Sequence, residues 1–340
     1  MINSSNNFDI KFGIQSDAER YFWAAYFLLG VLSSLIGDTL ILIASFQEGA
    51  FKVSKLIVTV IQHIAIADLG SSIMIFTPIL ISMLYNSWVL GDALCYVNAY
   101  ASFFTYQAGL FFITLLTITK FLLLRHPLKI SSISTKRAHL VCLSIWIFTM
   151  INPVVKLIVN KDDVRFDYRT YYCEYGYNAF SKTAKIILAI IHGVIPNFVI
   201  VATTIPTLQY LFTARQSARR VRSSDPWRGA LTVVLTAVAY TISTLPFCVY
   251  HIAVNFADED PSQPFPGHFR RICQSLLMIN TVANFFIYSL TIPSFRKFLS
   301  SQVISILRVS RRRTTTGATG TRDLIPLNLD KHDGIEIDYC

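Results

Sequence analysis

Seven long apolar runs, separated by short polar segments, dominate the chain. An α-helix rises about 1.5 Å per residue and the hydrocarbon core of a bilayer is about 30 Å thick, so each run is long enough to cross a membrane. In lipid the backbone must satisfy its own hydrogen bonds, which predicts a helix for every run. The runs are Tyr21–Phe46, Leu56–Tyr85, Leu94–Leu124, His139–Val159, Thr183–Phe212, Trp227–Phe256 and Phe269–Thr291.

The third run is the stretch around which the chain is organised. From Cys95 the sequence is almost uncharged until Lys120, and these residues would span roughly 37 Å as a helix. Its far end joins a basic cluster that includes Arg125 and Lys129. This pattern predicts a helix that crosses a membrane and is positively charged at one end.

Composition supports a membrane protein over a soluble one. The chain has 340 residues, of which 53% are apolar and 15% charged, and its mean hydropathy is +0.49. The formal charge of +10 is compatible with nucleic-acid binding only if the charges gather on a folded polar surface. They lie between apolar runs instead, so no nucleic-acid partner is predicted.

The distribution of Lys and Arg predicts how the helices are oriented, because these residues collect on the cytoplasmic side. One side gathers Lys52, Lys55, Lys120, Arg125, Lys129, Lys136, Arg137, Arg215, Arg219, Arg220, Arg222, Arg228, Arg296, Lys297 and Arg311–Arg313. The chain is therefore predicted to cross the plasma membrane several times, with its N-terminus outside the cell. Residues 1–20 are polar and lack the apolar stretch of a signal peptide, and Asn3 is a candidate glycosylation acceptor.

The predicted organisation is an all-α seven-helix transmembrane bundle with a short amphipathic eighth helix. Residues 1–20 form an extracellular N-terminus and residues 21–293 the bundle. Residues 294–308 show apolar side chains at helical spacing, which predicts an amphipathic helix on the inner leaflet and a contact with membrane lipid. Residues 309–340 are polar and are predicted to be a disordered cytoplasmic tail, in which Thr314–Thr316 are either phosphate acceptors or plain linker.

Several short motifs, in this order and spacing, resemble those of the rhodopsin-like (class A) G-protein-coupled receptors. The matching segments are Trp88-Val-Leu-Gly91-Asp-Ala-Leu-Cys95, Ala67-Asp68, Trp146, Cys173, Pro196, Leu245-Pro246-Phe247, Asn284-Phe-Phe-Ile-Tyr288 and Pro293-Ser-Phe295-Arg296. The resemblance covers about Tyr21 to Leu307. It implies a receptor that binds an extracellular ligand and activates a heterotrimeric G protein, with arrestin and a receptor kinase as further partners, and it implies no enzyme activity.

The resemblance also implies a disulfide between Cys95 and Cys173. Both cysteines fall on the predicted outer side, where disulfides persist. Three other cysteines, Cys142, Cys248 and Cys273, fall in or near helices and are expected to be small packing residues.

The departures from the family pattern lie among the residues that couple ligand binding to the G protein in the family. The residues at those positions here are Lys120, Thr244, Pro246, Asn284 and Tyr288. The usual Asp-Arg-Tyr reads Thr119-Lys120-Phe121, an aromatic residue before the sixth-helix proline is Thr244, and the seventh-helix proline is Phe285. Lys120 either faces the G protein in place of the family arginine or simply extends toward the headgroups. These changes leave open a receptor that binds ligand without coupling to a G protein.

The resemblance places the ligand pocket in the outer half of the bundle. Its candidate residues are Ser102, Phe103, Tyr106, Gln107, Phe247, Tyr250, His251, Gln274 and Met278. Ser102 stands where amine receptors carry an aspartate, so a biogenic amine is not expected, and a peptide or a small molecule is. Near the rim, Arg270, Arg271, Lys182 and Lys185 either receive an anionic or peptide ligand or are solvated charges.

Two carboxylates lie within the predicted helices, and such residues usually point inward and pair. By resemblance, Asp38 and Asp68 face one another near Asn280 and Asn284. Either Asp38 is a protonated stand-in for the family's asparagine, or the two carboxyl groups share a proton or a cation. Sodium is the candidate cation, and no other cofactor or metal is expected.

Two other classes of function are less well supported by the sequence. A transporter or channel would show inverted repeats and charged residues along a path, and no repeat is evident. An intramembrane hydrolase would need a metal set or a nucleophile with its base, and His63, His192 and Asp68 lie on separate helices without ligand spacing.

Overall fold

The computed structural model describes residues 16–51, 53–159, 164–168, 170–175, 182–218, 225–257 and 264–318. The chain divides into two units, Met1–Phe298 and Leu299–Cys340, which are treated separately below. Asn3 lies outside the described residues, as do residues 319–340.

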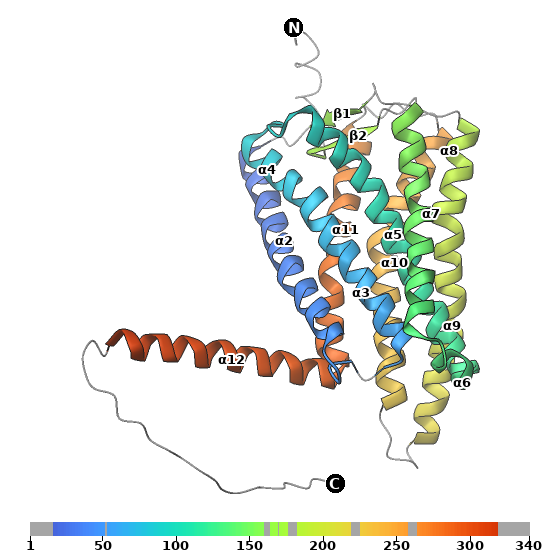
Figure 1. Cartoon of the computed structure of the whole chain (residues 1–340). Helices are drawn as coiled ribbons and strands as arrows, with labels where there is room; N and C mark the ends of the chain where they lie inside the picture. Colours follow the sequence, from blue (N-terminus) through green and yellow to red (C-terminus); the bar gives the residue numbers. More distant parts are fainter. Residues whose placement is uncertain are drawn as a thin grey trace, which may run out of the picture. The chain divides into compact units, whose positions relative to one another are not determined.

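Seven helical segments of the first unit are long and apolar enough to cross a membrane, which confirms the predicted fold class (Figure 1). Their helices are α2 (Asp17–Phe46), α3 (Lys55–Ser71) continued through η2 (Ser72–Phe76) into α4 (Thr77–Tyr85), α5 (Gly91–Arg125), α7 (Thr135–Val159), α8 (Lys182–Ala189) continued through η4 (Ile190–Val194) into α9 (Ile195–Ala218), α10 (Asp225–Ala257) and α11 (Pro264–Thr291). A short helix, α6 (Pro127–Ser131), follows α5. A hairpin of β1 (Val164–Asp167) and β2 (Tyr172–Tyr175) lies at the opposite end of the bundle from α6. We call the hairpin end the outer end and the α6 end the inner end.

The first helix begins earlier than predicted, at Asp17 instead of Tyr21. The Ser16 side chain accepts a hydrogen bond from the Glu19 amide at 3.1 Å, which caps the helix. Ser16 and Glu19 have the spacing of a capping box. Four residues assigned to the extracellular N-terminus therefore belong to the first turn.

Two of the seven segments contain a π-helical turn that the apolar pattern does not reveal. They are η2, in the second segment, and η4, in the fifth. A π turn inserts one extra residue into an α-helix and is often found at functional sites. Pro78 lies directly after η2, where the missing amide leaves a carbonyl of the preceding turn without its helical partner. The Met74 carbonyl, four residues before Pro78, accepts a hydrogen bond from the Asn98 side chain at 2.8 Å instead.

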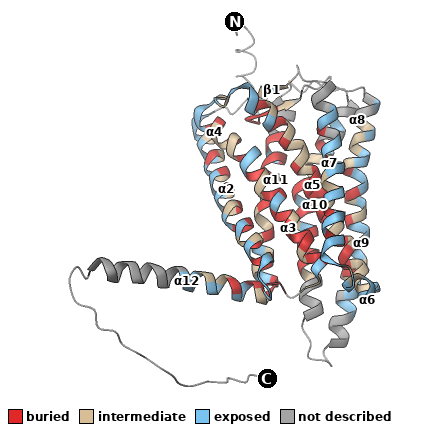
Figure 2. Cartoon of the chain, viewed as in Figure 1, coloured by how far each residue is buried: buried red, intermediate tan, exposed pale blue. Residues whose placement is uncertain are grey.

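The interior of the bundle is built around α5, the most buried of the seven segments. Figure 2 shows buried residues on the inward faces of the helices and exposed residues on the outside. Large apolar side chains are among the exposed ones, such as Phe46 at 75%, Phe198 at 71% and Leu290 at 73% exposure. Because a water-facing surface would not gather so many, the outside of the bundle is suited to lipid.

Glycine makes room for the residue that replaces the seventh-helix proline. A Cβ atom placed on Gly37 would lie 2.8 Å from both Cβ and Cγ of Phe285. Contacts that short do not occur, so α2 and α11 approach this closely only because Gly37 has no side chain. Phe285 therefore fits at this position only because residue 37 is a glycine.

The helix after the bundle, α12, runs from Pro293 to Ala318 and so continues past Arg308, where the sequence analysis ended it. No proline or glycine interrupts the chain between Pro293 and Gly317, which explains why the helix does not stop earlier. At its start, Phe295 belongs to the first unit and stacks on Phe51 at 5.2 Å between ring centroids.

Candidate functional site

The two faces of the hairpin at the outer end contact different helices, α5 and α11. Its strands are antiparallel, with Phe166 opposite Cys173 and Asp167 opposite Tyr172. Side chains alternate between the faces of a strand, so Phe166 and Cys173 share one face. On that face Cys173 joins Cys95 of α5, which confirms the predicted disulfide.

The apolar face of the hairpin packs on the outer end of α5. Cys95, Ala99 and Cys173 form one buried cluster, with Trp88 and Phe166 packed against it. Asn98 holds the same region by two hydrogen bonds: its amide nitrogen donates to the Met74 carbonyl in η2 at 2.8 Å, and its oxygen accepts from the Cys173 amide at 2.9 Å. Asn98 is 1% exposed and is a positioning residue that the sequence analysis did not single out.

The polar face of the hairpin binds Arg270 of α11. The Arg270 guanidinium pairs with Asp167 at 3.3 Å and with Glu174, and it donates to the Tyr172 hydroxyl at 3.0 Å. The neighbouring Arg271 pairs with Glu19 of α2 at 2.9 Å. The two rim arginines therefore tie the hairpin and the first helix to α11, and each already has a carboxylate partner.

The turn of the hairpin is fixed to the loop after α4. Tyr171 and Asn86 are the non-glycine residues with positive φ in the described chain, at 58° and 53°. The Tyr171 hydroxyl donates to the Asn86 side-chain oxygen at 2.7 Å. Burial raises the pKa of Tyr171, and the nearby Arg271 and Arg20 lower it in part. The phenol therefore stays protonated and able to donate this bond at neutral pH.

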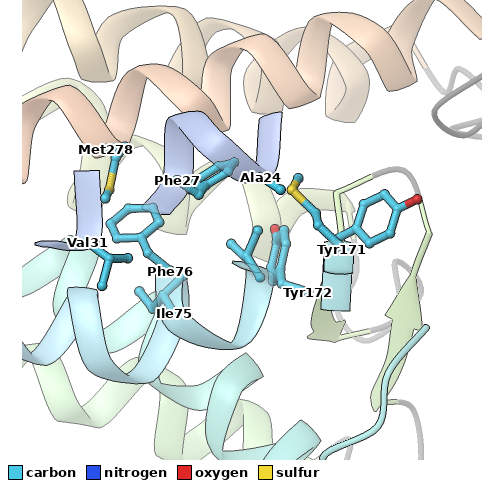
Figure 3. Close-up of a cluster of buried hydrophobic side chains, with 10 residues drawn as sticks. Ala24, Phe27, Val31, Ile75, Phe76, Tyr171, Tyr172 and Met278 are labelled. Atoms are coloured by element: carbon cyan, nitrogen blue, oxygen red, sulfur yellow. The ribbon is translucent and has the colours of Figure 1, made fainter. Parts of the chain in front are cut away.

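Met278, expected in the ligand pocket, lies in a hydrophobic cluster formed by α2, η2, α4, the hairpin and α11 (Figure 3). Phe27 and Phe76 stack there with ring centroids 5.9 Å apart. Tyr171 and Tyr172 enter the same cluster from the hairpin. These contacts make Met278 a packing residue of the outer core, held under the hairpin.

The remaining pocket candidates lie mainly on α5, α10 and α11. The Tyr106 ring packs on Phe247 at 5.5 Å between centroids, and its hydroxyl lies 3.0 Å from the Cys248 sulfur. Tyr250 forms a buried cluster with Cys273. Ser102 donates to the Asn98 carbonyl at 2.7 Å, Phe103 is half-buried, Gln107 and Gln274 are buried, and the side chain of His251 lies outside the described residues.

The two intramembrane carboxylates are brought together as expected. Asp38 and Asp68 are 0% and 3% exposed and interact electrostatically. Asn284, which was expected near the pair, donates a hydrogen bond to Asp68 at 2.9 Å and so joins the second and seventh segments. Asn280 is half-buried, and no described contact joins it to the pair.

Two serines that the sequence analysis passed over complete this cluster. Ser72 donates to Ser34, and Ser34 donates to Asp38, both at 2.6 Å. The second Asp38 oxygen, Oδ1, is buried without a hydrogen-bond partner among the described residues. An orphaned carboxyl oxygen next to a second carboxyl group fits either a proton or a small cation.

At the inner end, Lys120 is 8% exposed and makes no ion pair with any described residue. Thr119 beside it is buried, so the acid that pairs with the family's arginine has no equivalent there. Instead, Thr232 of α10 donates a hydrogen bond to Thr291 of α11 at 2.8 Å. This bond joins two helices at the inner end through uncharged side chains.

The other predicted switch residues are also placed inside the bundle. The Thr244 hydroxyl donates to the Tyr240 carbonyl at 2.8 Å, and Pro246 lies within α10 two residues after Thr244. Tyr288 is 1% exposed, and its hydroxyl has no partner among the described residues. Its ring contacts Phe51 edge-on at 6.3 Å.

Trp146 contacts a histidine that has no assigned role. Its indole N–H donates to Nδ1 of His63 at 3.0 Å, and Nε2 of His63 lies 3.3 Å from Nδ1 of His139. Because Nδ1 of His63 accepts, the proton of the neutral ring is on Nε2 and points toward His139. The contact links the second and fourth segments.

Comparisons with known proteins agree with this architecture. The sequence pattern of the seven-transmembrane receptor (rhodopsin) family matches residues 37–288. The chain is 20% identical to melatonin receptor type 1C of Xenopus laevis, over 88% of this chain and 72% of the relative. It is 25% identical to melatonin receptor type 1B of Rattus norvegicus, over 70% of this chain and 66% of the relative.

A third relative is named for a different kind of ligand. The uracil nucleotide/cysteinyl leukotriene receptor of Homo sapiens is 23% identical over 71% of this chain and 63% of its own length. All three relatives are receptors by name, and the match to the family spans most of the helical bundle. The chain belongs to the seven-transmembrane receptor (rhodopsin) family, that is, to the class A G-protein-coupled receptors.

Proposed function

We propose that this receptor converts the binding of an extracellular ligand in the outer half of the bundle into activation of a heterotrimeric G protein at the inner end. The observation that carries the proposal is the position of the hairpin, tied to α5 by Cys173 and to α11 by Arg270. Because the hairpin is fixed to both helices, a ligand that displaces it would also displace α5 and α11, which extend to the inner end. The relatives named above are, by name, receptors for melatonin and for uracil nucleotides or cysteinyl leukotrienes, which supports the assignment of a ligand-binding role.

The proposed orientation places the N-terminus outside the cell and the inner end in the cytoplasm of the plasma membrane. The basic residues of the inner loops support it, since Lys and Arg collect on the cytoplasmic side. Arg125, Lys129 and Lys136 lie in or beside α6, at the inner end. In this orientation the inner loops also meet anionic lipid, and Thr314–Thr316 would be accessible to a receptor kinase and then to arrestin.

A sodium ion at the Asp38–Asp68 pair is part of the proposal. The unpartnered Oδ1 of Asp38 and the bonds that Ser34 and Asn284 make to the two carboxyl groups support it. Carboxylate and hydroxyl oxygens are hard ligands of the kind that such cations prefer. The ion would stabilise one arrangement of the second and seventh segments, with Asp38 supplying an oxygen.

The alternative is a receptor that binds its ligand without activating a G protein. It is favoured by the Thr119-Lys120-Phe121 sequence, because a lysine has no planar fork with which to bond several acceptors at once. The two readings differ in one measurement. The full chain in lipid nanodiscs is mixed with purified heterotrimeric G proteins, and nucleotide exchange is measured with and without tissue extract. Exchange that exceeds the rate of empty nanodiscs supports coupling, and its absence with every G-protein subtype contradicts it.

A further inference from the structure

Gln107 of α5 is a buried polar residue to which neither the candidate site nor the packing of the described helices assigns a role. It is 1% exposed, and neither its Nε2 nor its Oε1 has a hydrogen-bond partner among the described residues. Burying an amide without partners costs free energy, on the order of 1–3 kcal/mol. A leucine or methionine would fill the same space without that cost, so the amide needs another explanation.

The position of Gln107 on the helix shows where the amide lies. Phe104 and Phe111, three residues before and four after, contact Trp146 and Phe148 of α7, each at 5.2 Å between ring centroids. Tyr106, about 100° away around the helix, contacts α10. Gln107 therefore occupies the sector between the α7 face and the α10 face of α5.

That sector is where the π turn η4 packs. His192 of η4 lies edge-on to Phe111 at 6.1 Å and stacks on Phe148 at 5.4 Å, with 28° between the ring planes. Phe148 is 41% exposed on the outside of the bundle, whereas Phe111 and His192 are half-buried. Phe111 and His192 therefore form an aromatic wall one helical turn from Gln107. A π turn facing an unpartnered buried amide is a second sign of a binding site, because such turns are frequent at functional sites.

The charges at the outer end restrict what can bind beneath them. Arg270 faces two carboxylates, Asp167 and Glu174, so this group carries an excess negative charge. Arg271 is paired with Glu19. Both rim arginines are therefore already paired with carboxylates, and the expectation that they receive an anion is not supported by their contacts.

We propose that Gln107 anchors a neutral ligand that carries a hydrogen-bond acceptor and donor side by side, as an amide or lactam does, on a flat aromatic group. The amide of Gln107 presents one acceptor and one donor and no charge, so it pairs with such a group by two hydrogen bonds. The aromatic part of the ligand packs against Phe111 and His192. This inference names the ligand class of the receptor proposed above and rests on that function.

The test compares two probes of the same shape and different charge, phenylacetamide and phenylacetate, at millimolar concentration. The purified full chain in nanodiscs is melted with each probe, and apparent affinity is taken from the concentration dependence of Tm. We expect phenylacetamide to raise Tm and phenylacetate not to. In Gln107→Met the apparent affinity for phenylacetamide should fall by about tenfold or more, since both hydrogen bonds are lost.

A matched control keeps the result interpretable. Gln62 is also a buried glutamine, but its amide donates to the Ser45 carbonyl at 3.4 Å near the inner end. Gln62→Met should leave the Tm shift caused by phenylacetamide unchanged. The inference is overturned if phenylacetate shifts Tm as much as the amide, if neither probe shifts it, or if Gln107→Met retains the wild-type response.

Failure of this inference can be told apart from failure of the proposed function. The melting experiment contains no G protein, so it measures recognition alone. A chain that binds phenylacetamide through Gln107 and never stimulates nucleotide exchange contradicts the proposed function and supports the ligand class. Exchange evoked by tissue extract and unchanged in Gln107→Met contradicts the ligand class and supports the function.

Discussion

At the scale of single residues, the inner end of the third helix differs from its family in charge and in shape. Lys120 is buried and has no carboxylate partner among the described residues. A buried ammonium without a partner is costly, so its retention suggests a partner that arrives with another molecule. Under the function proposed above, that molecule is the G protein, which would supply the hydrogen-bond acceptor for the ammonium group.

The first prediction concerns this lysine. Lys120→Ala should lower basal and extract-evoked nucleotide exchange by more than about tenfold, because truncating one member of an interfacial charged pair leaves the other unpaired. Lys120→Arg should keep or raise exchange, since the guanidinium adds donors. Lys120→Met separates charge from packing, because it keeps the apolar stem. Normal exchange in the methionine variant, with surface expression matched, would show that Lys120 only fills space.

The second prediction concerns Asp38. Its Oδ1 lacks a partner while Oδ2 accepts from Ser34 at 2.6 Å. If the carboxyl pair binds sodium, protons compete with the ion, and basal exchange should respond to sodium more strongly at pH 8 than at pH 6, values chosen to lie roughly on either side of neutrality. Asp38→Asn keeps the shape and the bond from Ser34 but removes the charge, so it should weaken both dependences. Sodium titrations that coincide for the two proteins would identify Asp38 as a neutral asparagine mimic.

At the scale of elements, the short hairpin is held in place on both of its faces by contacts with helices. One face carries the disulfide and the other the arginine, and both are buried against helices. Isolated hairpins are marginally stable, so β1 and β2 depend on α5 and α11 for their structure. This explains why the hairpin was not predicted: nothing in Val164–Tyr175 identifies the distant residues that order it.

The third prediction tests the polar face of the hairpin. Arg270→Met should reduce the amide hydrogen-exchange protection of β1 and β2, because it leaves the buried Asp167 and the half-buried Glu174 without this counter-charge. Removing one partner of a buried ion pair typically costs about 3–5 kcal/mol. The triple variant Arg270→Met, Asp167→Asn, Glu174→Gln removes every charge and should recover much of the protection. Equal loss in the single and triple variants would mean that Arg270 acts by shape, and full protection in the single variant would mean that the disulfide is sufficient.

The sequence predicted the elements well where a single physical requirement decides the outcome. Seven apolar runs had to be helices because lipid leaves the backbone no other partner, and the computed spans agree. The requirement says nothing about detail inside a helix. The π turns, the capping of α2 by Ser16 and the continuation of α12 to Ala318 depend on local hydrogen bonds that apolar periodicity does not record.

The candidate site was predicted in part, for a similar reason. Cys95 and Cys173 were matched through the resemblance, and Asp68 and Asn284 were placed near one another. Asn98, Ser34 and Ser72 were missed, because a buried Asn or Ser in an apolar helix looks the same in sequence whether or not it bonds a neighbouring helix. Gln107 was grouped with the pocket, but only the structure shows that its amide has no partner.

At the scale of the whole molecule, the bundle is closed at both ends by different chemistry. The outer end is held by a disulfide and by ion pairs, and the inner end by hydrogen bonds and aromatic contacts. Ion pairs and disulfides resist separation, whereas a single neutral hydrogen bond is worth about 0.5–1.5 kcal/mol. From the contacts of the described residues, the inner end is therefore the end that opens at lower cost, as the proposed coupling to a G protein requires.

The last prediction follows from this asymmetry. Movement of α10 away from α11 must break the bond from Thr232 to Thr291, which is 2.8 Å long and buried. Thr232→Val keeps the shape and removes the donor, so the closed state loses a stabilisation that the open state never had. Basal exchange should rise by roughly 2- to 10-fold, the population shift that corresponds to one hydrogen bond. Thr236→Val is the matched control, since its hydroxyl lies one turn away on the same helix, is buried and has no partner among the described residues. Basal exchange that rises equally in both variants would point to a general loosening of α10, and no rise in Thr232→Val would show that the bond does not hold the inner end closed.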